Sequence, residues 1–330
     1  MKKAIIIFIA AVIMLSLCAC AETGSTHTPD PATAEPANAA TDAPVTTGAP
    51  SAPTDQPGGD STDVPPDAPS EAPSEAPTAE PVKGSEGLVI TDDGSRCIVT
   101  GIGTCTLSEI VIPSHVNGKP VELIDECAFQ ENKSITSVFI PGTVKKIDED
   151  AFAGCTALAS VTLSEGTETI GESAFYCCTA LKSITIPQSV RWISGYAFRF
   201  CGLEEVTILG CSDIRSNAFA GCDFLKSFTV KNLGNETYQI MSNAFGDCRS
   251  LETLMLAPGL TEIGTWNFTD ANNIKTVFLP RSLKKIGACS FLRSVIETVY
   301  YEGSESEWKA IEIKEPTFEP KVEYNSSFGN

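Results

Sequence analysis

Histidine is almost absent from this chain of 330 residues, which contains only His27 and His115. A catalytic serine or cysteine usually needs a histidine beside it inside the fold. His27 lies in a proline-rich segment and His115 in a turn-like sequence, so neither suits that role. The sequence also lacks a His-Glu-x-x-His motif, a Walker A loop and a Gly-x-Gly-x-x-Gly motif. We therefore expect no catalysis, although a glycosidase with two carboxylates stays open because acidic residues are plentiful.

Paired metal-binding cysteines are also missing, since none of the 13 cysteines forms a Cys-x-x-Cys motif. We expect no metal and no cofactor. Five cysteines each follow a phenylalanine by three residues, which predicts a ladder of small, buried, mostly free thiols: Cys155, Cys178, Cys201, Cys222 and Cys248. Adjacent side chains in such a ladder point the same way, which suits a disulfide poorly. If one disulfide forms, we expect it between Cys97 and Cys105.

No hydrophobic run is long enough for a comfortable membrane-spanning helix. Residues 1–20 instead have two lysines, an apolar run and a small-residue end, which is typical of a secretory signal. The end, Leu17-Cys-Ala-Cys20, resembles the lipobox of bacterial lipoproteins. That resemblance implies that Cys20 is lipidated and anchors the chain to the membrane without a spanning helix. An ordinary cleaved signal is the alternative.

Lysine and arginine are absent from residues 21–82, which hold eleven acidic residues and 13 of the 21 prolines. Such a composition cannot bury a core, so residues 21–83 are predicted to be a disordered stalk. The formal net charge of the whole chain is −19. No basic stripe is visible in the remainder, which argues against a nucleic-acid partner.

What the rest of the chain contains is a repeat of about 23 residues. One phenylalanine returns in each unit: Phe129, Phe152, Phe175, Phe198, Phe219, Phe245, Phe268 and Phe291. A small residue precedes it, an isoleucine lies five residues before it, and a short β-like segment follows. A lone unit cannot bury enough apolar surface to offset its conformational entropy, so the units must stack. The period loosens between Leu209 and Met241, where we expect irregular curvature.

Residues 84–123 differ from the repeat and predict an N-terminal cap module. Leu88–Ile90 and Cys97–Val99 flank an Asp-Asp-Gly sequence, which indicates a β-hairpin. A calcium site at these aspartates is the weaker interpretation, because no longer oxygen-rich loop accompanies them. We assign residues 124–315 to the repeat solenoid and residues 316–330 to a C-terminal tail.

The repeated pattern Ala-Phe-x-x-Cys-x-x-Leu-x-x-Val-x-Ile-Pro resembles the BspA-like family of bacterial leucine-rich repeats. The sequence from Val299 to Ile311 is similar to that family's last repeat, in which Trp308 would cap the core. The resemblance implies a leucine-rich repeat solenoid with a parallel β-sheet on one face and short helical turns on the other. It also implies a cell-surface location and adhesion or protein binding.

The outward positions of the predicted strands are the candidate ligand surface. Most are serine or threonine, which simply suit an exposed strand. The residues that stand out are Phe139, Glu205, Met255, Phe278 and Tyr300. Met255, Phe278 and Tyr300 occupy equivalent positions in adjacent units and should face solvent together, as an apolar contact surface would.

These observations predict a monomeric, non-catalytic protein that is lipid-anchored on the extracellular face of a bacterial membrane. Its partner would be a host or envelope protein. Two alternatives stay open: a glycan-binding accessory to an enzyme, and a passive structural protein of the envelope.

Overall fold

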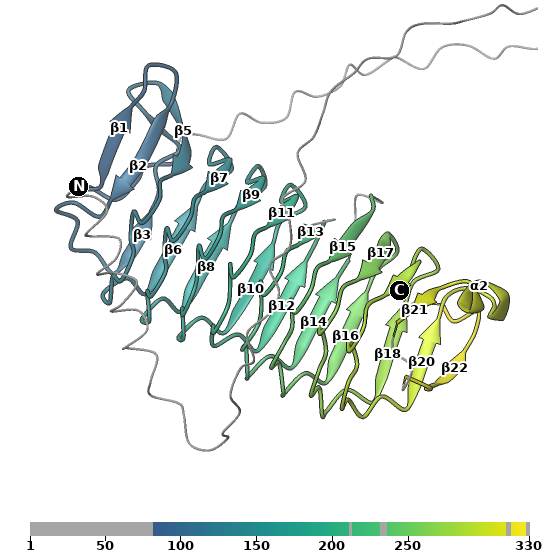
Figure 1. Cartoon of the computed structure of the whole chain (residues 1–330). Coiled ribbons are helices and arrows are strands. Elements are labelled where there is room, and N and C mark those ends of the chain that lie inside the picture. The colour runs from purple at the N-terminus through teal and green to yellow at the C-terminus, as the bar shows by residue number, and fades with distance from the viewer. Residues whose placement is uncertain (1–81, 211–212, 232–235, 315–317, 328–330) are drawn as a thin grey trace, which may run out of the picture. The chain divides into compact units, whose positions relative to one another are not determined.

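The computed structural model describes residues 82–210, 213–231, 236–314 and 318–327, all of which belong to one compact unit. The signal, Cys20 and the stalk up to residue 81 lie outside the described residues. The described unit is a parallel β-solenoid, which confirms the predicted fold class (Figure 1). None of the helices found among the described residues is long and apolar enough to cross a membrane.

Two parallel sheets run the length of the solenoid. We call the first the isoleucine sheet, because the repeated isoleucine ends most of its strands. Its twelve strands are β1 (Val89–Asp92), β2 (Cys97–Gly101), β4 (His115–Val116), β5 (Lys119–Ile124), β7 (Lys146–Ile147), β9 (Thr169–Ile170), β11 (Trp192–Ile193), β13 (Asp213–Ile214), β15 (Tyr238–Ile240), β17 (Leu260–Ile263), β19 (Lys285–Ile286) and β21 (Glu312–Ile313).

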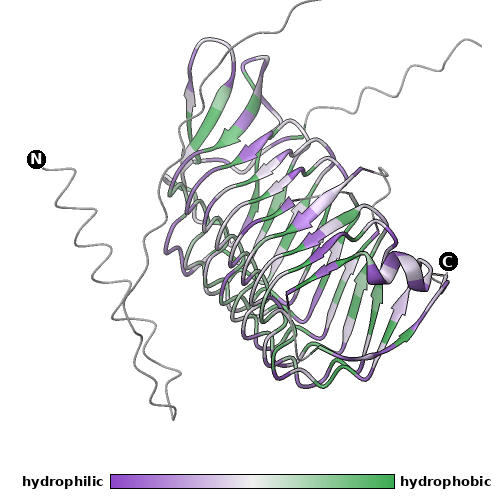
Figure 2. Ribbon diagram, turned by 45° about the vertical axis from the view of Figure 1, so that its right-hand side comes forward, coloured by the Kyte–Doolittle hydropathy of each residue, from purple (hydrophilic) through white to green (hydrophobic). Residues whose placement is uncertain are grey.

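The second, which we call the threonine sheet, contains the short strands predicted after each repeated phenylalanine. It consists of a row of three strands, β3 (Glu109–Val111), β6 (Ser137–Ile140) and β8 (Ser160–Leu163), and a row of seven, β10 (Ser183–Ile186), β12 (Glu205–Ile208), β14 (Ser227–Val230), β16 (Thr253–Leu256), β18 (Thr276–Leu279), β20 (Thr298–Tyr301) and β22 (Lys321–Glu323). Buried and solvent-facing residues alternate along these strands, as Figure 2 shows by hydropathy.

The predicted short helical turns are wrong, because the segments around the repeated phenylalanine are not helical. Residues two before and two after each phenylalanine have left-handed backbone, as at Cys127 (φ 56°) and Glu131 (φ 59°) around Phe129. A right-handed helix cannot contain such residues. The segment instead pairs with the next coil: the N–H of Phe129 donates to the carbonyl of Ala151 at 2.8 Å. We call this third hydrogen-bonded side the turn ladder.

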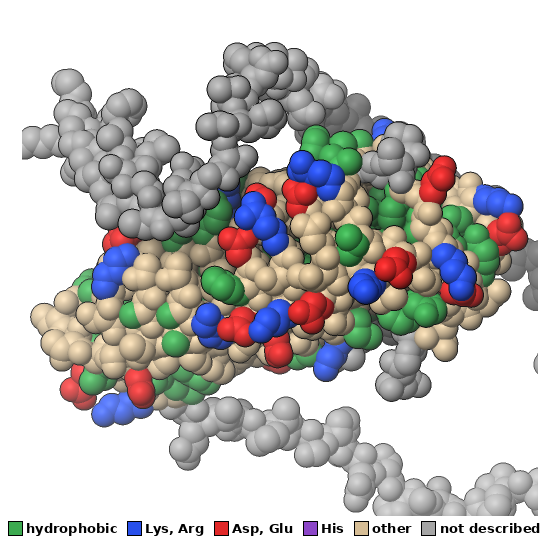
Figure 3. Space-filling view, turned by 90° about the horizontal axis from the view of Figure 1, so that it is seen from below, with side chains coloured by type: hydrophobic (Ala, Val, Ile, Leu, Met, Phe, Trp, Pro, Cys, Tyr) green, Lys and Arg blue, Asp and Glu red, His purple; other side chains and the backbone are tan. Residues whose placement is uncertain are grey.

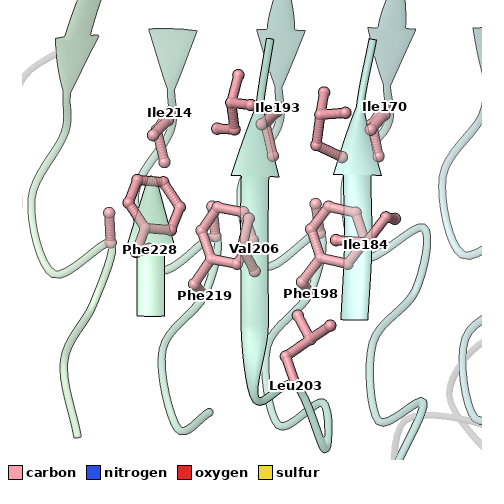
Figure 4. Close-up of a cluster of buried hydrophobic side chains, with 14 of the residues drawn as sticks. Ile170, Ile184, Ile193, Phe198, Leu203, Val206, Ile214, Phe219 and Phe228 are labelled. Carbon is pink, nitrogen blue, oxygen red and sulfur yellow. The ribbon is translucent and has the colours of Figure 1, made fainter. Parts of the chain in front are cut away.

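The core is a column of stacked phenylalanine rings. Neighbouring rings from Phe129 to Phe291 lie nearly parallel, with centroids 4.9–5.4 Å apart. Figure 4 shows Phe198 and Phe219 side by side, with Ile193 and Ile214 above them. All eight rings are buried. Each therefore packs against the coil before and the coil after, which is why a single repeat cannot fold alone.

The predicted thiol ladder is confirmed. The five cysteines are buried and free, and each Sγ donates to the carbonyl of a phenylalanine in the preceding coil, as Cys201 does to Phe175 at 3.0 Å. Burial raises the pKa of the Cys155 and Cys222 thiols to about 12, which keeps them protonated and unreactive. The suggested disulfide between Cys97 and Cys105 is wrong, since both are free. Cys97 points into the core, with Sγ 3.7 Å from the carbonyl oxygen of Val116.

The two ends of the solenoid close it differently. At the N-terminal end β1 and β2 form the predicted antiparallel hairpin, and the N–H of Gly94 donates to the Asp92 carboxylate, as a turn requires. At the C-terminal end helix α2 (Glu305–Lys309) places Trp308 edge-on against Tyr301, at 5.3 Å between centroids. Trp308 therefore packs against the coil that ends at Tyr301.

The residues assigned to a C-terminal tail also join the stack. Strand β22 pairs with β20, and Phe318 stacks on Phe291 at 4.5 Å. The irregular stretch between Leu209 and Met241 keeps its pairing where it is described. Strands β12, β14 and β16 are in continuous register, and within this stretch the isoleucine sheet shifts register beside Tyr238. The extra residues therefore leave both sheets connected.

Candidate interaction surface

The outward residues of the threonine sheet form two straight columns, because neighbouring strands are in register. The first column contains the first residue of each strand, and the second column contains the third. In the second column Thr229 pairs with Met255, Met255 with Phe278, and Phe278 with Tyr300. All three apolar side chains are partly exposed. The rings of Phe278 and Tyr300 stack at 4.8 Å with 15° between their planes. We call Met255, Phe278 and Tyr300 the apolar patch.

The other two predicted surface residues lie apart from the apolar patch. Phe139, on β6, belongs to the same column but is at the N-terminal end, opposite Val111 and Thr162. Glu205 belongs to the first column, between Ser183 and Ser227, and is separated from the strand of Met255 by β14. The structure therefore brings together three of the five predicted residues.

A row of alternating charges borders the threonine sheet, where each strand begins. Its members are Lys182, Glu204, Lys226, Glu252, Lys275 and Glu297. The backbone N–H of each of Glu204, Lys226, Glu252 and Glu297 donates to the residue before it in the row. Glu204 lies 3.5 Å from Lys182 and 3.4 Å from Lys226. The hydrogen bond from Lys226, more than its charge, holds the pKa of Glu204 below its usual value. Figure 3 shows acidic and basic side chains intermingled on the face seen there.

Sequence reasoning missed this row, because the residues that form it lie in the connections before the strands rather than in the strands. The signal was available: lysine and glutamate alternate at the position just before each strand from Lys182 onward. Exposed pairs of this kind add little stability. They do place a polar rim next to the apolar patch, as at many protein interfaces.

The acidic turn at Asp148–Asp150 holds a carboxyl group whose pKa is strongly raised. Burial, followed by the charges of Glu149, Glu126 and Glu172, raises the pKa of Asp150 to about 6. No basic group contributes to that shift. Among the residues that the structure describes, no group of three histidine, cysteine or acidic side chains is placed to hold a metal ion. His115 is exposed on β4 and remote from these acids in the sequence.

Comparison with known proteins also identifies leucine-rich repeats in this chain. A family model described as the BspA type leucine rich repeat region matches residues 103–226 and 210–319. The chain is 26% identical to a leucine-rich repeat protein of T. pallidum, over 63% of this chain and 87% of that one, with a TM-score of 0.51. It is 24% identical to one from Bacteroides ovatus, over 73% and 70%, with a TM-score of 0.46. No curated protein sequence matches.

The matched residues include most strands of both sheets and the whole thiol ladder, and they make up well over half of the chain. Leucine-rich repeat proteins are scaffolds that generally bind protein partners on their extended sheet surfaces. The chain belongs to the BspA-type leucine-rich repeat family.

Proposed function

We propose that this protein is a non-catalytic adhesion or binding protein whose protein partner docks on the threonine sheet at the apolar patch. The observation that carries the proposal is the contiguity of Met255, Phe278 and Tyr300 on the outer face of adjacent strands. Between Phe139 and Met255 the residues of the same column are all threonine: Thr162, Thr185, Thr207 and Thr229. An apolar strip on an otherwise hydroxyl-lined sheet is a typical contact surface.

The surroundings of the patch favour a protein partner. Aromatic residues and methionine are enriched at protein interfaces, and charged residues usually lie at the rim. Here Lys275 and Glu297 stand at the starts of the strands of Phe278 and Tyr300, and Glu323 pairs with Tyr300 from β22. The stacked rings also lose little side-chain entropy on binding, because each already packs against its neighbour.

The proposed location follows from the sequence at the N-terminus. Lipidation at Cys20 would anchor the chain on the extracellular face of the bacterial membrane. The proline-rich stalk would hold the solenoid away from the lipid surface. We propose that the protein acts as a monomer, in which the β1–β2 hairpin closes the N-terminal end and the coil of β21 and β22 forms the C-terminal end.

The test is a capture experiment with the full-length chain against host and envelope surface proteins, followed by affinity measurement for each captured protein. The double variant Phe278→Ala/Tyr300→Ala should weaken binding at least tenfold. Phe139→Ala is the matched control, since it removes an outward phenylalanine from the same column at the far end. Equal binding by the double variant would disprove the docking site. Loss of glycan binding instead of protein binding in that variant would favour an accessory role.

A further inference from the structure

The outer face of the isoleucine sheet holds an exposed tryptophan that no part of the proposed function uses. Trp192, on β11, is 43% exposed and stands between Thr169 and Asp213 in register. Its neighbour in the strand, Ile193, is buried in the core. An exposed indole leaves apolar surface in contact with water, and a polar residue at this position would not. Trp192 is therefore a candidate contact for a ligand.

A polar hollow lies beside this tryptophan. It encloses about 470 Å³ and is lined by Lys145, Glu168 and Arg191 from three successive coils, with Gln188, Ser189 and Glu236. A smaller hollow of about 140 Å³ adjoins it and is lined by Trp192 and Asp213. Arg191 and Glu236 line both hollows. The ion pair of Arg191 and Glu236 therefore borders both hollows, and the indole of Trp192 borders the smaller one.

The floor of the hollow is held by a fixed set of hydrogen bonds. The Glu165 carboxylate accepts from the backbone N–H groups of Gln188 and Ser189 at 2.9 and 3.0 Å. The Ser189 hydroxyl donates to the carbonyl of Thr167 at 2.7 Å and accepts from the N–H of Gly166 at 2.8 Å. These contacts join two coils, so the shape of the hollow does not depend on a ligand.

The walls, in contrast, keep hydrogen-bonding capacity for a ligand. Arg191 lies 3.7 Å from Glu236, and Lys145 lies 3.8 Å from Glu168. All four side chains are about half exposed, so these ion pairs are weak and readily exchanged for other partners. Arginine and lysine donate hydrogen bonds, and the carboxylates accept them.

This chemistry identifies the ligand class. The two cations are outnumbered by four carboxylates, those of Glu165, Glu168, Asp213 and Glu236, so the site does not attract an anion. No aliphatic side chain lines either hollow, which is unsuitable for a lipid tail. A neutral saccharide fits both features, because its hydroxyl groups donate and accept, and its C–H face packs on an indole. We propose that Trp192, Arg191, Lys145 and Glu236 form a binding site for a neutral glycan chain.

The site is separate from the apolar patch, since it lies on the other sheet and in earlier coils. Glycan binding and protein binding are therefore independent. The variant Phe278→Ala/Tyr300→Ala should keep its glycan affinity, and Trp192→Ala should keep its affinity for a protein partner.

The test uses the full-length chain on an array of neutral oligosaccharides that includes glucans, mannans and N-acetylglucosamine oligomers, followed by tryptophan fluorescence titration with each hit. We expect binding that Trp192→Ala weakens at least tenfold and Arg191→Ala weakens severalfold. The matched control is Trp266→Ala, because Trp266 is 48% exposed but lies on the turn ladder. Its affinity should stay within about twofold of the unaltered chain.

Three results would overturn the proposal. The first is no binding to any neutral glycan, and the second is binding restricted to anionic glycans. The third is a loss of affinity in Trp266→Ala equal to that in Trp192→Ala. Unchanged melting temperatures for both variants establish that a loss of binding is local, which is expected because both side chains are exposed.

Discussion

Replacing one ring of the phenylalanine column tests the central claim that stacking between coils holds the solenoid together. Phe198 is fully buried, and its ring lies 5.2 Å from those of Phe175 and Phe219. Truncating a buried phenylalanine to alanine costs about 3–5 kcal/mol, through lost burial and the cavity left behind. Stacking against each of the two neighbouring rings stabilises the fold by about 0.5–1.5 kcal/mol more than burial of the ring's surface alone. We therefore expect the loss of stability in Phe198→Ala to lie in the upper part of the range of about 3–5 kcal/mol.

The position of Phe198 makes a second, qualitative effect measurable. Stability in a repeat array depends on the interfaces between neighbouring coils, so a weakened central interface uncouples the two halves. Urea titration of Phe198→Ala, followed by circular dichroism, should show a broadened or two-step transition where the unaltered chain shows one. The midpoint is then the safer measure, because a single free energy of unfolding is not defined for such a transition.

Two comparison variants make this experiment decisive. Phe198→Leu keeps most of the volume but not the ring stack, so it should lower the midpoint by much less than alanine does. Phe224→Ala removes a phenylalanine that is 59% exposed in the adjacent coil and should cost below about 1 kcal/mol. A Phe198→Ala midpoint shift no larger than that of Phe224→Ala would refute the stacking argument.

Three further predictions concern charge and anchoring. Burial raises the pKa of Cys155 and Cys222 from 9.0 to about 12, so the folded state favours the protonated thiols. The free energy of unfolding should therefore stay at its full value below pH 9 and fall between pH 9 and 12, by about 3–4 kcal/mol per thiol. Thermal melts at alkaline pH measure this fall. Replacing Cys222 by alanine should shrink that fall, and an unchanged fall would show that other groups cause it. The pKa of Asp150 is raised from 3.8 to about 6, so ionisation of this carboxyl group destabilises the folded state as the pH rises through that window. Asp150→Asn should raise the free energy of unfolding at pH 7 by about 1 kcal/mol, allowing for solvent screening, and leave it unchanged at pH 3. A lower stability of the variant at pH 7 would contradict this. Cys20→Ala should release the chain from membranes in a fractionation experiment, and undiminished retention would exclude lipidation at that residue.

The core and the threonine sheet were predictable because their signals repeat eight times. A phenylalanine such as Phe175 and the strand after it keep the same spacing in every coil to within one residue, so a chance match is excluded. The thiol ladder followed from the same spacing. Alternation along each strand also placed Met255, Phe278 and Tyr300 outside, which the register of the strands bears out.

The isoleucine sheet and the turn ladder were not predictable for physical reasons. Strands such as β11 have two residues, which is too short for an alternating pattern to be visible. The left-handed positions are occupied by residues as different as Cys127, Ser173 and Trp266, rather than by a repeated glycine. Their conformation is imposed by hydrogen bonds to the next coil, and a sequence read one unit at a time does not reveal it. Trp192 was missed because it occurs in one coil only.

The direction of the hydrogen bonds between coils bears on how the molecule responds to tension. On all three sides they join one coil to the next, and so they run along the solenoid axis. A pull between the two ends of the solenoid stretches these bonds lengthwise, and the coils can separate one after another. Each coil of about 23 residues releases roughly 75 Å of extended chain when it opens. The repeat array is thus a series of extensible links, which lengthens under load before the whole domain unfolds.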